Sequence, residues 1–388
     1  MELADRMGRL GTESAFEVLT RARQLEAEGR KVIHLEIGEP DFDTPAHIVE
    51  AAERALRDGF THYTPAAGIP ELREAVAAFF ARTRGVEVSA DRVVVTPGAK
   101  PVMLYVIMAL CQEGDEVLYP DPGFPMYESL SAFAGARPVP VPLREERDFR
   151  MDPDEVASLL SDRTRLVVLN SPHNPCGSSQ SPEDVRRLAE VLEGRDVYVL
   201  SDEMYWAIRY EGDHASIGTL LPDRTVVLDG CSKTFAMTGW RMGFASLPDE
   251  LVEPVTRLII NSVSCTAAFV QKAAVAALEG PWEPVEEMVT EFRRRRDVIV
   301  EGLRRIEGLS CVEPSGAFYA FPNCSGLGRP AREVAVELLE RAGVAGLWGT
   351  AFGSAGEGYI RLSYANSVEN IRDALEAMEA VLPEIARG

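Results

Sequence analysis

Five short apolar runs between residues 93 and 228 constrain the fold of this chain more than any other feature. Each run is four residues long and rich in aliphatic or β-branched residues, as buried strands are. Turn-forming loops follow the runs, and helical patterns follow several of these loops. The runs occupy residues 93–96, 116–119, 166–169, 197–200 and 225–228. Because strands that alternate with helices pack as a mostly parallel sheet covered on both faces, the pattern predicts a three-layer α/β domain with a mostly parallel, mixed sheet.

The two ends of the chain predict a second, smaller domain. An amphipathic helix over 14–28 and a short strand over 31–35 precede the alternating region. The C-terminal part carries strand candidates followed by helices, a pattern typical of α+β domains, at 318–321, 331–342, 359–362 and 368–382. The 388 residues are enough for two cores. We therefore expect a large domain over residues 46–285 and a small α+β domain built from both termini, residues 1–45 plus 286–388.

Composition limits the classes of binding partner and the cellular compartment that we expect for this protein. The net charge of −21 disfavours nucleic acid and anionic membranes as partners, and we interpret the basic run 293–296 as a solvated helix face. No apolar run approaches the ~18 residues of a membrane span, and the N-terminus lacks the apolar core of a signal peptide. The six cysteines show neither a CxxC pair nor metal-ligand spacing with the histidines. These features predict reduced thiols, no metal site and a cytoplasmic protein.

One lysine, Lys233, follows the last apolar run within a stretch of small and hydroxyl residues that ends near Arg241. A partly desolvated lysine with a lowered pKa can form a Schiff base with a carbonyl, and an arginine can grip a phosphate with two hydrogen bonds. This pair matches the needs of pyridoxal phosphate, which carries an aldehyde and a phosphate. Taken alone, Lys233 is more simply interpreted as a surface lysine on a loop, because isolated motif matches are weak.

Further polar and aromatic residues stand at predicted strand ends or in turns, where α/β folds place their chemistry. Asp202 ends one strand, where a buried carboxylate could hold a pyridine nitrogen protonated or could simply cap a helix. The turn 98–100 opens a helix and offers backbone N–H groups to an anion. The remaining candidates are a ring between prolines, a turn amide, a tyrosine and a strand arginine: Phe124, Asn174, Tyr205 and Arg361. Judged singly, each has a plain explanation in packing, turn formation or solvation.

In order and spacing, these segments together resemble the class I and II, aspartate aminotransferase-like family of pyridoxal phosphate enzymes of fold type I. The resemblance extends from the Gly-Glu-Pro-Asp-Phe-Asp-Thr-Pro loop at 38–45 to Arg-Leu-Ser-Tyr at 361–364. Its densest parts are 63–73, the Asn-Pro-x-Gly turn at 174–177, Ser-Asp-Glu at 201–203, and Ser-Lys-Thr-Phe-Ala-Met-Thr-Gly-Trp-Arg at 232–241. The last of these is highly specific.

The resemblance implies a transaminase that moves an amino group between an L-amino acid and a 2-oxo acid through a Schiff base of Lys233 with pyridoxal phosphate. It also implies a homodimer with active sites at the subunit interface. Arg361, Asn174 and the loop at Gly38 would bind the substrate. The implied cofactor contacts are Asp202 at the pyridine nitrogen, Tyr205 and Asn174 at the ring oxygen, Phe124 on the ring face, Lys233 at the aldehyde, Gly98, Ala99, Lys100 and Arg241 at the phosphate, and Tyr63 at the phosphate of the neighbouring subunit.

Three positions depart from the family pattern. Gly230 stands where many relatives have a phosphate-binding serine, Cys176 replaces a common threonine, and Trp348 occupies a position that could line the substrate pocket. These departures leave open a β- or γ-elimination, replacement or cyclisation on the same cofactor. A non-enzymatic ligand sensor is less favoured, since the chain carries no added basic DNA-binding domain. A nicotinamide dehydrogenase is disfavoured as well, because no GxGxxG follows the first strand.

Overall fold

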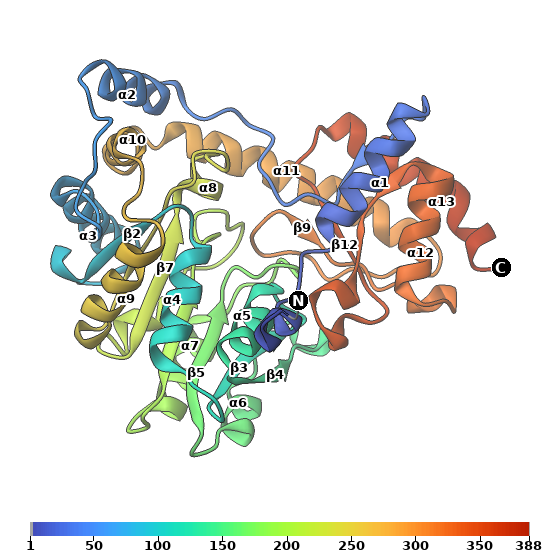
Figure 1. Cartoon of the computed structure of the whole chain (residues 1–388). Coiled ribbons are helices and arrows are strands. Elements are labelled where there is room, and N and C mark those ends of the chain that lie inside the picture. Colours follow the sequence, from blue (N-terminus) through green and yellow to red (C-terminus); the bar gives the residue numbers. More distant parts are fainter. Residues whose placement is uncertain (1–2, 388) are drawn as a thin grey trace.

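A seven-stranded mixed sheet forms the centre of the larger lobe in the computed structural model, which describes residues 3–387 (Figure 1). Its strand order is β2-β8-β7-β6-β5-β3-β4, and β8 runs antiparallel to both of its neighbours. The strands are β2 (Val93–Thr96), β3 (Glu116–Asp121), β4 (Arg137–Pro142), β5 (Thr164–Asn170), β6 (Tyr198–Asp202), β7 (Thr225–Gly230) and β8 (Gly243–Ser246). All the other pairs are parallel, so the predicted mostly parallel, mixed sheet is confirmed.

Two strands of this sheet, β4 and β8, were not predicted. β4 has the sequence Arg-Pro-Val-Pro-Val-Pro and lies at the edge of the sheet, where missing backbone N–H groups are tolerated. β8 has the sequence Gly-Phe-Ala-Ser and no apolar run, yet it is buried because it fills the gap between β2 and β7. In both cases the place in the sheet overrides a weak local propensity.

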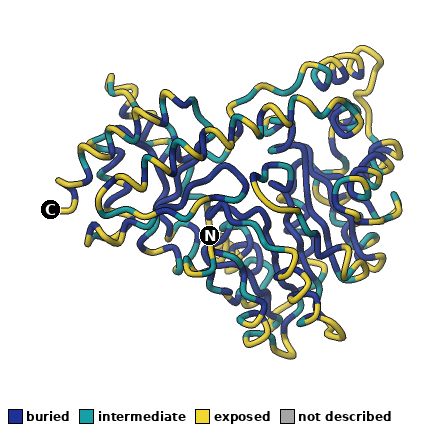
Figure 2. The backbone as a smooth tube through the Cα atoms, turned by 180° about the vertical axis from the view of Figure 1, so that it is seen from behind, coloured by how far each residue is buried: buried dark blue, intermediate teal, exposed yellow. Residues whose placement is uncertain are grey.

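Helices cover both faces of the sheet because alternate residues of a strand point to opposite sides. Leu166 and Val168 of β5 pack in one core with α4, whereas Val167 and Leu169 pack in another core with α7. Figure 2 shows the strands buried and the exposed residues gathered on the outer helices. The helices of this lobe are α2 (Ala46–Arg57), α3 (Pro70–Arg84), α4 (Lys100–Leu110), α5 (Met126–Ala134), α6 (Pro153–Leu159), α7 (Pro182–Leu192), α8 (Cys231–Thr234), α9 (Asp249–Ser262) and α10 (Ala268–Glu279).

Both termini build the smaller lobe, as predicted. β1 (Ile33–His34) pairs in parallel with β10 (Val344–Ala345), and Arg21 of α1 (Ala15–Ala27) makes hydrogen bonds of 2.6 and 2.8 Å with Glu340. Figure 1 shows α1 beside α12 and α13. The other elements of this lobe are α11 (Glu283–Arg305), β9 (Tyr319–Ala320), α12 (Ala331–Glu337), β11 (Leu347–Trp348), β12 (Ile360–Ser363) and α13 (Val368–Ile385). The division at residue 285 stays a prediction, and that position lies inside the continuous helix α11.

Only half of the basic run on α11 is the solvated face that we predicted, since Arg293 and Arg294 are exposed. Arg295 and Arg296 are buried. Arg295 pairs with Asp41 at 2.6 Å and with Glu291 at 3.0 Å, and Arg296 pairs with Asp297 at 2.7 Å. The prediction failed for Arg295 because its acidic partner Asp41 comes from a distant loop, which helical periodicity cannot reveal.

Candidate active site

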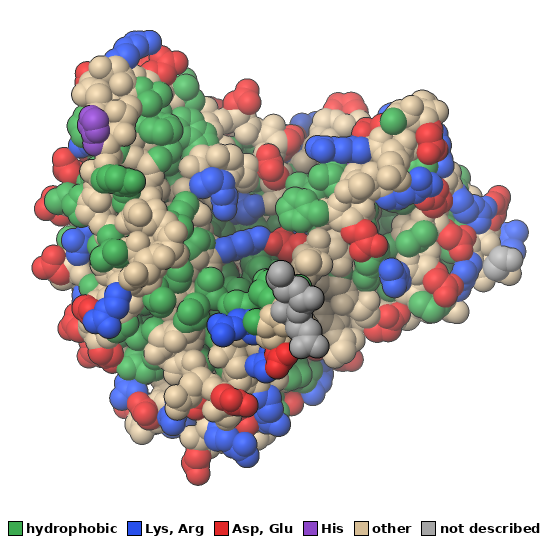
Figure 3. All heavy atoms as spheres, in the orientation of Figure 1, with side chains coloured by type: hydrophobic (Ala, Val, Ile, Leu, Met, Phe, Trp, Pro, Cys, Tyr) green, Lys and Arg blue, Asp and Glu red, His purple; other side chains and the backbone are tan. Residues whose placement is uncertain are grey.

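A cavity of about 650 Å³ lies between the two lobes, at the carboxyl ends of the central strands. Asn170 ends β5 and Asp202 ends β6, and both line its wall, as does Lys233 from α8, the short helix that directly follows β7. Segments 13–16 and 37–39 of the smaller lobe form part of the opposite side. Figure 3 shows Lys and Arg side chains gathered in the hollow between the lobes. This is where open α/β sheets bind their ligands.

Lys233 carries an amine with a lowered pKa. Its Nζ donates a hydrogen bond of 2.5 Å to the carbonyl oxygen of Gly38 and lies 5.8 Å from the centre of the Phe318 ring. Burial lowers the pKa of Lys233 to about 8; Glu39 opposes the shift, and Arg361 adds to it. A substantial fraction of this amine is therefore neutral slightly above neutral pH, as a nucleophile or a general base requires.

Asp202 is a buried carboxyl at the end of β6 that accepts two hydrogen bonds. The hydroxyl of Tyr127 donates to Oδ2 at 2.6 Å, and the backbone N–H of Met204 donates to Oδ1 at 3.2 Å. Burial raises the pKa of Asp202 to about 6, although the hydrogen bond from Tyr127 opposes the shift. Asp202 is thus mostly charged at neutral pH and can hold a positive partner in a site that excludes water.

Arg361 of β12 presents a buried guanidinium to the cavity. It lies between two aromatic rings, 4.6 Å from the centre of Tyr319 and 4.8 Å from that of Phe352. Nη1 donates to Oδ1 of Asn174 at 3.1 Å, and Nη2 donates to the carbonyl oxygen of Glu36. Nε is buried and finds no partner within residues 3–387. A fixed guanidinium with an unused donor suits a carboxylate ligand.

The turn before α4 brings the backbone of Gly98 against Arg241. Gly98 has a φ of +84°, and a Cβ at this position would lie 2.3 Å from Nη2 of Arg241. A Cβ on Gly243 of β8 would lie 2.3 Å from the carbonyl carbon of Gly98. Only glycines permit this close approach, which joins the N-terminus of α4 to a guanidinium and so forms an anion site. The amine of Lys100 contacts Glu13 and lies 5.5 Å from the centre of the Phe124 ring.

The structure brings most of the predicted site residues into this one cavity. The lining includes Gly38, Ala99, Lys100, Phe124, Asn174, Asp202, Tyr205, Lys233, Arg241 and Arg361. Gly98 adjoins it through Arg241, whereas Tyr63 lies outside and is 89% exposed. Trp348 does not line the cavity either, because its neighbour Leu347 does. The roles of these residues toward a ligand stay predictions.

Among the cavity residues that the sequence analysis did not predict, three make hydrogen bonds to predicted site residues. Tyr127 follows Phe124 by one helical turn, and this spacing could have revealed it. Asn170 donates to the carbonyl oxygen of Asp202 at 3.0 Å, and its Oδ1 accepts from the backbone N–H of Asn174 at 3.0 Å, which fixes the two strand ends. Tyr319 meets the hydroxyl of Tyr205 at 2.8 Å, a contact between lobes that leaves no local signal in the sequence.

The departure at Gly230 has a steric explanation. A Cβ there would lie 2.6 Å from the carbonyl oxygen of Met242 and 3.1 Å from Cα of Gly243. The backbone that leads into β8 therefore occupies the space that a side chain would need. A serine at position 230 would require this backbone to move.

Comparison with known proteins decides the family. Residues 30–378 match the family described as aminotransferase class I and II. The chain belongs to this family. It is 42% identical to an aspartate aminotransferase of Pyrococcus horikoshii over 98% of this chain and 97% of that one. It is 39% identical to aromatic-amino-acid aminotransferase 2 of Thermococcus litoralis over 99% of each chain.

A solved structure gives the same result. The aspartate aminotransferase of Thermus thermophilus with maleate superposes with a TM-score of 0.95 at 40% identity, covering 98% of this chain and all of that one. The chain is therefore an aminotransferase of the α/β class, and none of these relatives supports the elimination, replacement or cyclisation alternative. Within residues 3–387, no helix has both the length and the apolar character of a membrane span.

Proposed function

We propose that this aminotransferase binds pyridoxal phosphate in the cavity at Lys233 and moves an amino group between an L-amino acid and a 2-oxo acid. The observation that carries the proposal is that Lys233, Asp202, Arg241 and Arg361 all line one cavity between the lobes. When bound, the cofactor supplies an aldehyde that carries the amino group and a ring that withdraws electrons from the substrate.

The residues of the cavity fit such a cofactor. Asp202 offers a buried carboxylate to a pyridinium nitrogen, and Tyr127 helps to keep it charged. The cradle in which Gly98 approaches Arg241 suits a phosphate, since a Cβ at Gly98 would fill it. Lys233 would hold the aldehyde through Nζ. The predicted contacts of Ala99 and Lys100 with the phosphate, of Asn174 and Tyr205 with the ring oxygen, and of Phe124 with the ring face belong to the same proposal.

Arg361 would orient the substrate. Its buried Nε lacks a partner within the described residues, and a substrate carboxylate would supply one. Asn174 and the carbonyl oxygen of Glu36 hold the guanidinium in place, so little side-chain entropy is lost on binding. The loop at Gly38 and the segment 13–16 line the same cavity and would exclude water from the bound substrate.

Lys233 would also move the proton. Its Nζ lies at the cavity, so it would accept the proton from Cα of a substrate bound there. With a pKa of about 8, the amine can accept and release a proton near physiological pH. The carboxylate of Asp202 would stabilise the positive charge of a protonated pyridine nitrogen, which favours removal of that proton.

We further propose a homodimer in which the partner subunit's Tyr63 reaches the phosphate. The side chain of Tyr63 is 89% exposed in the single chain, which is unusual for a tyrosine and leaves it available to a second subunit. The proposed cytoplasmic location rests on six free cysteines, five of them buried. The proposed domains remain residues 46–285 and residues 1–45 plus 286–388.

A half-reaction tests the proposed function. The purified protein is loaded with pyridoxal phosphate and mixed with one amino acid and no oxo acid. We expect one equivalent of 2-oxo acid per subunit, together with the aminated form of the cofactor. Lys233→Ala is expected to bind the cofactor without the absorbance band of the covalent complex and to lose turnover. Steady turnover by Lys233→Ala would refute the assignment.

A further inference from the structure

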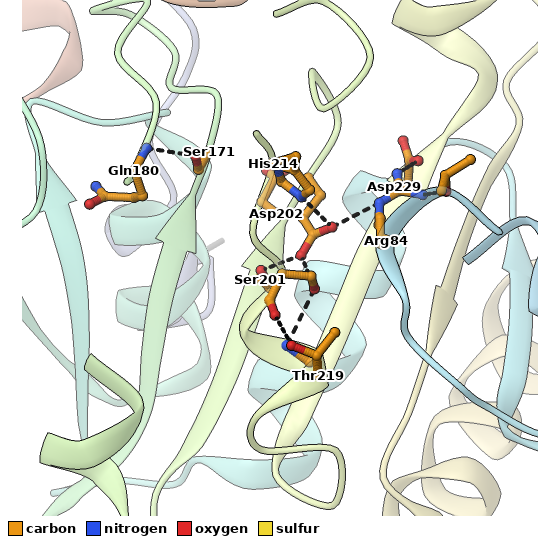
Figure 4. A network of polar contacts seen from close by, with 12 residues as sticks. Arg84, Ser171, Gln180, Ser201, Asp202, His214, Thr219 and Asp229 are labelled. Atoms are coloured by element: carbon orange, nitrogen blue, oxygen red, sulfur yellow. Dashed lines mark hydrogen bonds and ion pairs between the residues drawn. The ribbon is translucent and has the colours of Figure 1, made fainter. Parts of the chain in front are cut away.

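Arg84, Glu203, Asp229 and His214 form a buried ionic cluster beside the cavity wall (Figure 4). Nε of Arg84, the last residue of α3, lies 2.8 Å from Oε2 of Glu203, and its Nη2 contacts Oδ2 of Asp229. Nε2 of His214 lies 3.0 Å from the same oxygen of Glu203. The side chains of Arg84, Glu203 and Asp229 are each at most 2% exposed. The described site does not use any of these four residues.

Neighbouring groups hold the cluster rigidly. Ser201 and Ser216 donate hydrogen bonds of 2.8 and 2.6 Å to Oε1 of Glu203. The guanidinium of Arg84 lies over the ring of Trp206, 4.2 Å from its centre. Glu203 is thus fixed, and the guanidinium lies between its carboxylate partners and an aromatic face. Buried networks of this kind specify one arrangement of the elements they join.

The cluster joins the two strands that carry the site. Glu203 directly follows Asp202 at the end of β6, and Asp229 precedes Gly230 and the helix of Lys233. Consecutive residues of a strand face opposite sides, so Asp202 lies at the cavity while Glu203 faces Arg84. The β6–β7 ladder ends with the backbone N–H of Glu203 donating to Leu228 at 2.9 Å. Beyond that bond, Arg84 bridges the two strand ends through their side chains.

Asp229 also fixes its own strand end. Its Oδ1 accepts a hydrogen bond of 2.7 Å from the backbone N–H of Gly230, and Cys231 donates to the carbonyl oxygen of Met242 at 3.1 Å. The start of α8 is therefore tied to the cluster on one side and to the chain entering β8 on the other. A shift of Asp229 would be transmitted over a few bonds to Lys233.

We propose that Arg84 is a positioning residue, which pairs with Glu203 and Asp229 and so fixes the placement of Asp202 relative to Lys233. The inference rests on the proposed roles of Asp202 and Lys233. Without the guanidinium, the carboxyl groups of Glu203 and Asp229 lose their shared cationic partner in the core, so that they move apart or Asp229 keeps its proton to higher pH. Either response displaces a strand end, and a displacement of the order of 1 Å in an active site can lower the rate about a hundredfold.

The test compares Arg84→Met with Arg84→Lys in the protein loaded with pyridoxal phosphate. Three quantities are measured: the pH midpoint of the absorbance change of the bound cofactor without substrate, kcat with KM for the amino acid, and the thermal unfolding midpoint. For Arg84→Met we expect a pH midpoint shifted by about half a unit or more and a kcat lowered about tenfold to a hundredfold. KM should change less, because Arg361 and Asn174 are linked to the cluster only indirectly, through Asn170 and the backbone of Asp202. Arg84→Lys should change both the pH midpoint and kcat less than Arg84→Met does.

Arg296→Met is the matched control. Arg296 is likewise buried and ion-paired, but it lies on α11 and does not line the cavity. The substitution Arg296→Met should lower the thermal unfolding midpoint, while the pH midpoint and kcat stay at the wild-type values. If Arg84→Met does not fold, Arg84→Lys and Glu203→Gln are compared by the same three measurements, with smaller shifts in the same quantities expected.

Wild-type values of the pH midpoint and kcat in the Arg84 variants, with only the unfolding midpoint lowered, would overturn the inference. An equal shift of the pH midpoint in Arg296→Met would overturn it as well, since any loss of stability would then suffice. A wild-type protein that gives no absorbance band with pyridoxal phosphate would refute the proposed function, and this inference with it.

Discussion

Asp202 depends on a single hydroxyl for part of its charge. Tyr127 donates to its carboxylate at 2.6 Å, a bond that favours the charged form and opposes the effect of burial on the pKa. The two residues belong to different elements, since Tyr127 lies in the first turn of α5 and Asp202 ends β6. The pKa of about 6 places this carboxyl close to the range in which cells operate, so small changes around it have large effects on its charge.

Tyr127→Phe should therefore move the acid limb of the pH–rate profile to higher pH. The substitution removes a hydrogen bond to the charged form, and so raises the pKa of Asp202 further above its ordinary value. We expect a shift of roughly one unit, which corresponds to the free energy of one hydrogen bond to a charged group. The measurement is kcat/KM between pH 5 and 9. The control is Tyr198→Phe, which removes a tyrosine hydroxyl that is bonded to Glu250 outside the cavity, and it should leave the acid limb in place. If Tyr127→Phe leaves the acid limb unmoved, the assignment of this limb to Asp202 is contradicted.

At the scale of elements, β8 decides the shape of the anion site. It lies between β2 and β7, and Gly243 pairs with Thr96 on one side and with Gly230 on the other. This position brings Gly243 against the backbone of Gly98, where α4 begins. The strand therefore sets the distance between the helix N-terminus and Arg241, although its own sequence gives little sign of a strand.

Gly243→Ala should weaken cofactor binding and lower stability together. The new Cβ would lie 2.3 Å from the carbonyl carbon of Gly98, so the backbone of β8 or of the turn before α4 must shift. We expect a loss of about 1–3 kcal/mol in the free energy of unfolding and a rise of about tenfold or more in the dissociation constant of pyridoxal phosphate. Gly239→Ala is the control for stability, because a Cβ at Gly239 meets nothing within 4 Å. Equal stability of the two variants would contradict this account of β8.

Asp229, at the end of β7, should make the stability of the protein depend on pH. Burial raises its pKa from an ordinary 3.8 to about 7, with Arg84 opposing the shift. The folded chain thus keeps this proton to higher pH than the unfolded chain does, so the contribution of Asp229 to stability falls as the pH rises from about 4 to about 7. Arg84 and Glu203 are the charged groups that face it.

In Asp229→Asn this dependence should disappear. The free energy of unfolding of the variant, minus that of the wild type, should rise by about 1 kcal/mol or more from pH 5 to pH 8. Urea unfolding across this range measures the difference. A constant difference between the two proteins at every pH would show that Asp229 does not titrate there.

At the scale of the whole molecule, the proposed dimer can be tested by mixing two inactive variants. Tyr63→Ala and Lys233→Ala should each be inactive or nearly so as a pure protein. In a hybrid dimer, one site would combine both defects, whereas the other would hold an intact Lys233 and the partner subunit's intact Tyr63. Subunits mixed equally and reassociated should therefore recover up to about a quarter of the wild-type activity, given an isologous interface with two sites. No recovery, with hybrid dimers confirmed by mass spectrometry, would exclude a shared site.

Some elements of this fold could be predicted from the sequence, and others could not. Strands β2, β3, β5, β6 and β7 were predictable because each is an apolar run. Helices α3 and α7 were predictable because a proline marks the start of each. β8 and β4 were not, since only their neighbours in the sheet make them strands. Tyr319 and the Arg84 cluster were invisible for a related reason. Their partners are brought together by packing between distant segments, and no local pattern encodes such a contact.

The sequence by itself determined five of the seven strands, the family and the candidate chemistry, because apolar runs and the motifs at their ends are local patterns. Lys233, Asp202 and Arg361 could be named from such runs. Only the tertiary structure decided what surrounds them: a buried amine with a pKa of about 8, a carboxyl held by Tyr127, and a guanidinium whose Nε has no partner among residues 3–387. Burial and hydrogen bonding depend on which distant segments meet, and these set the charge of each group.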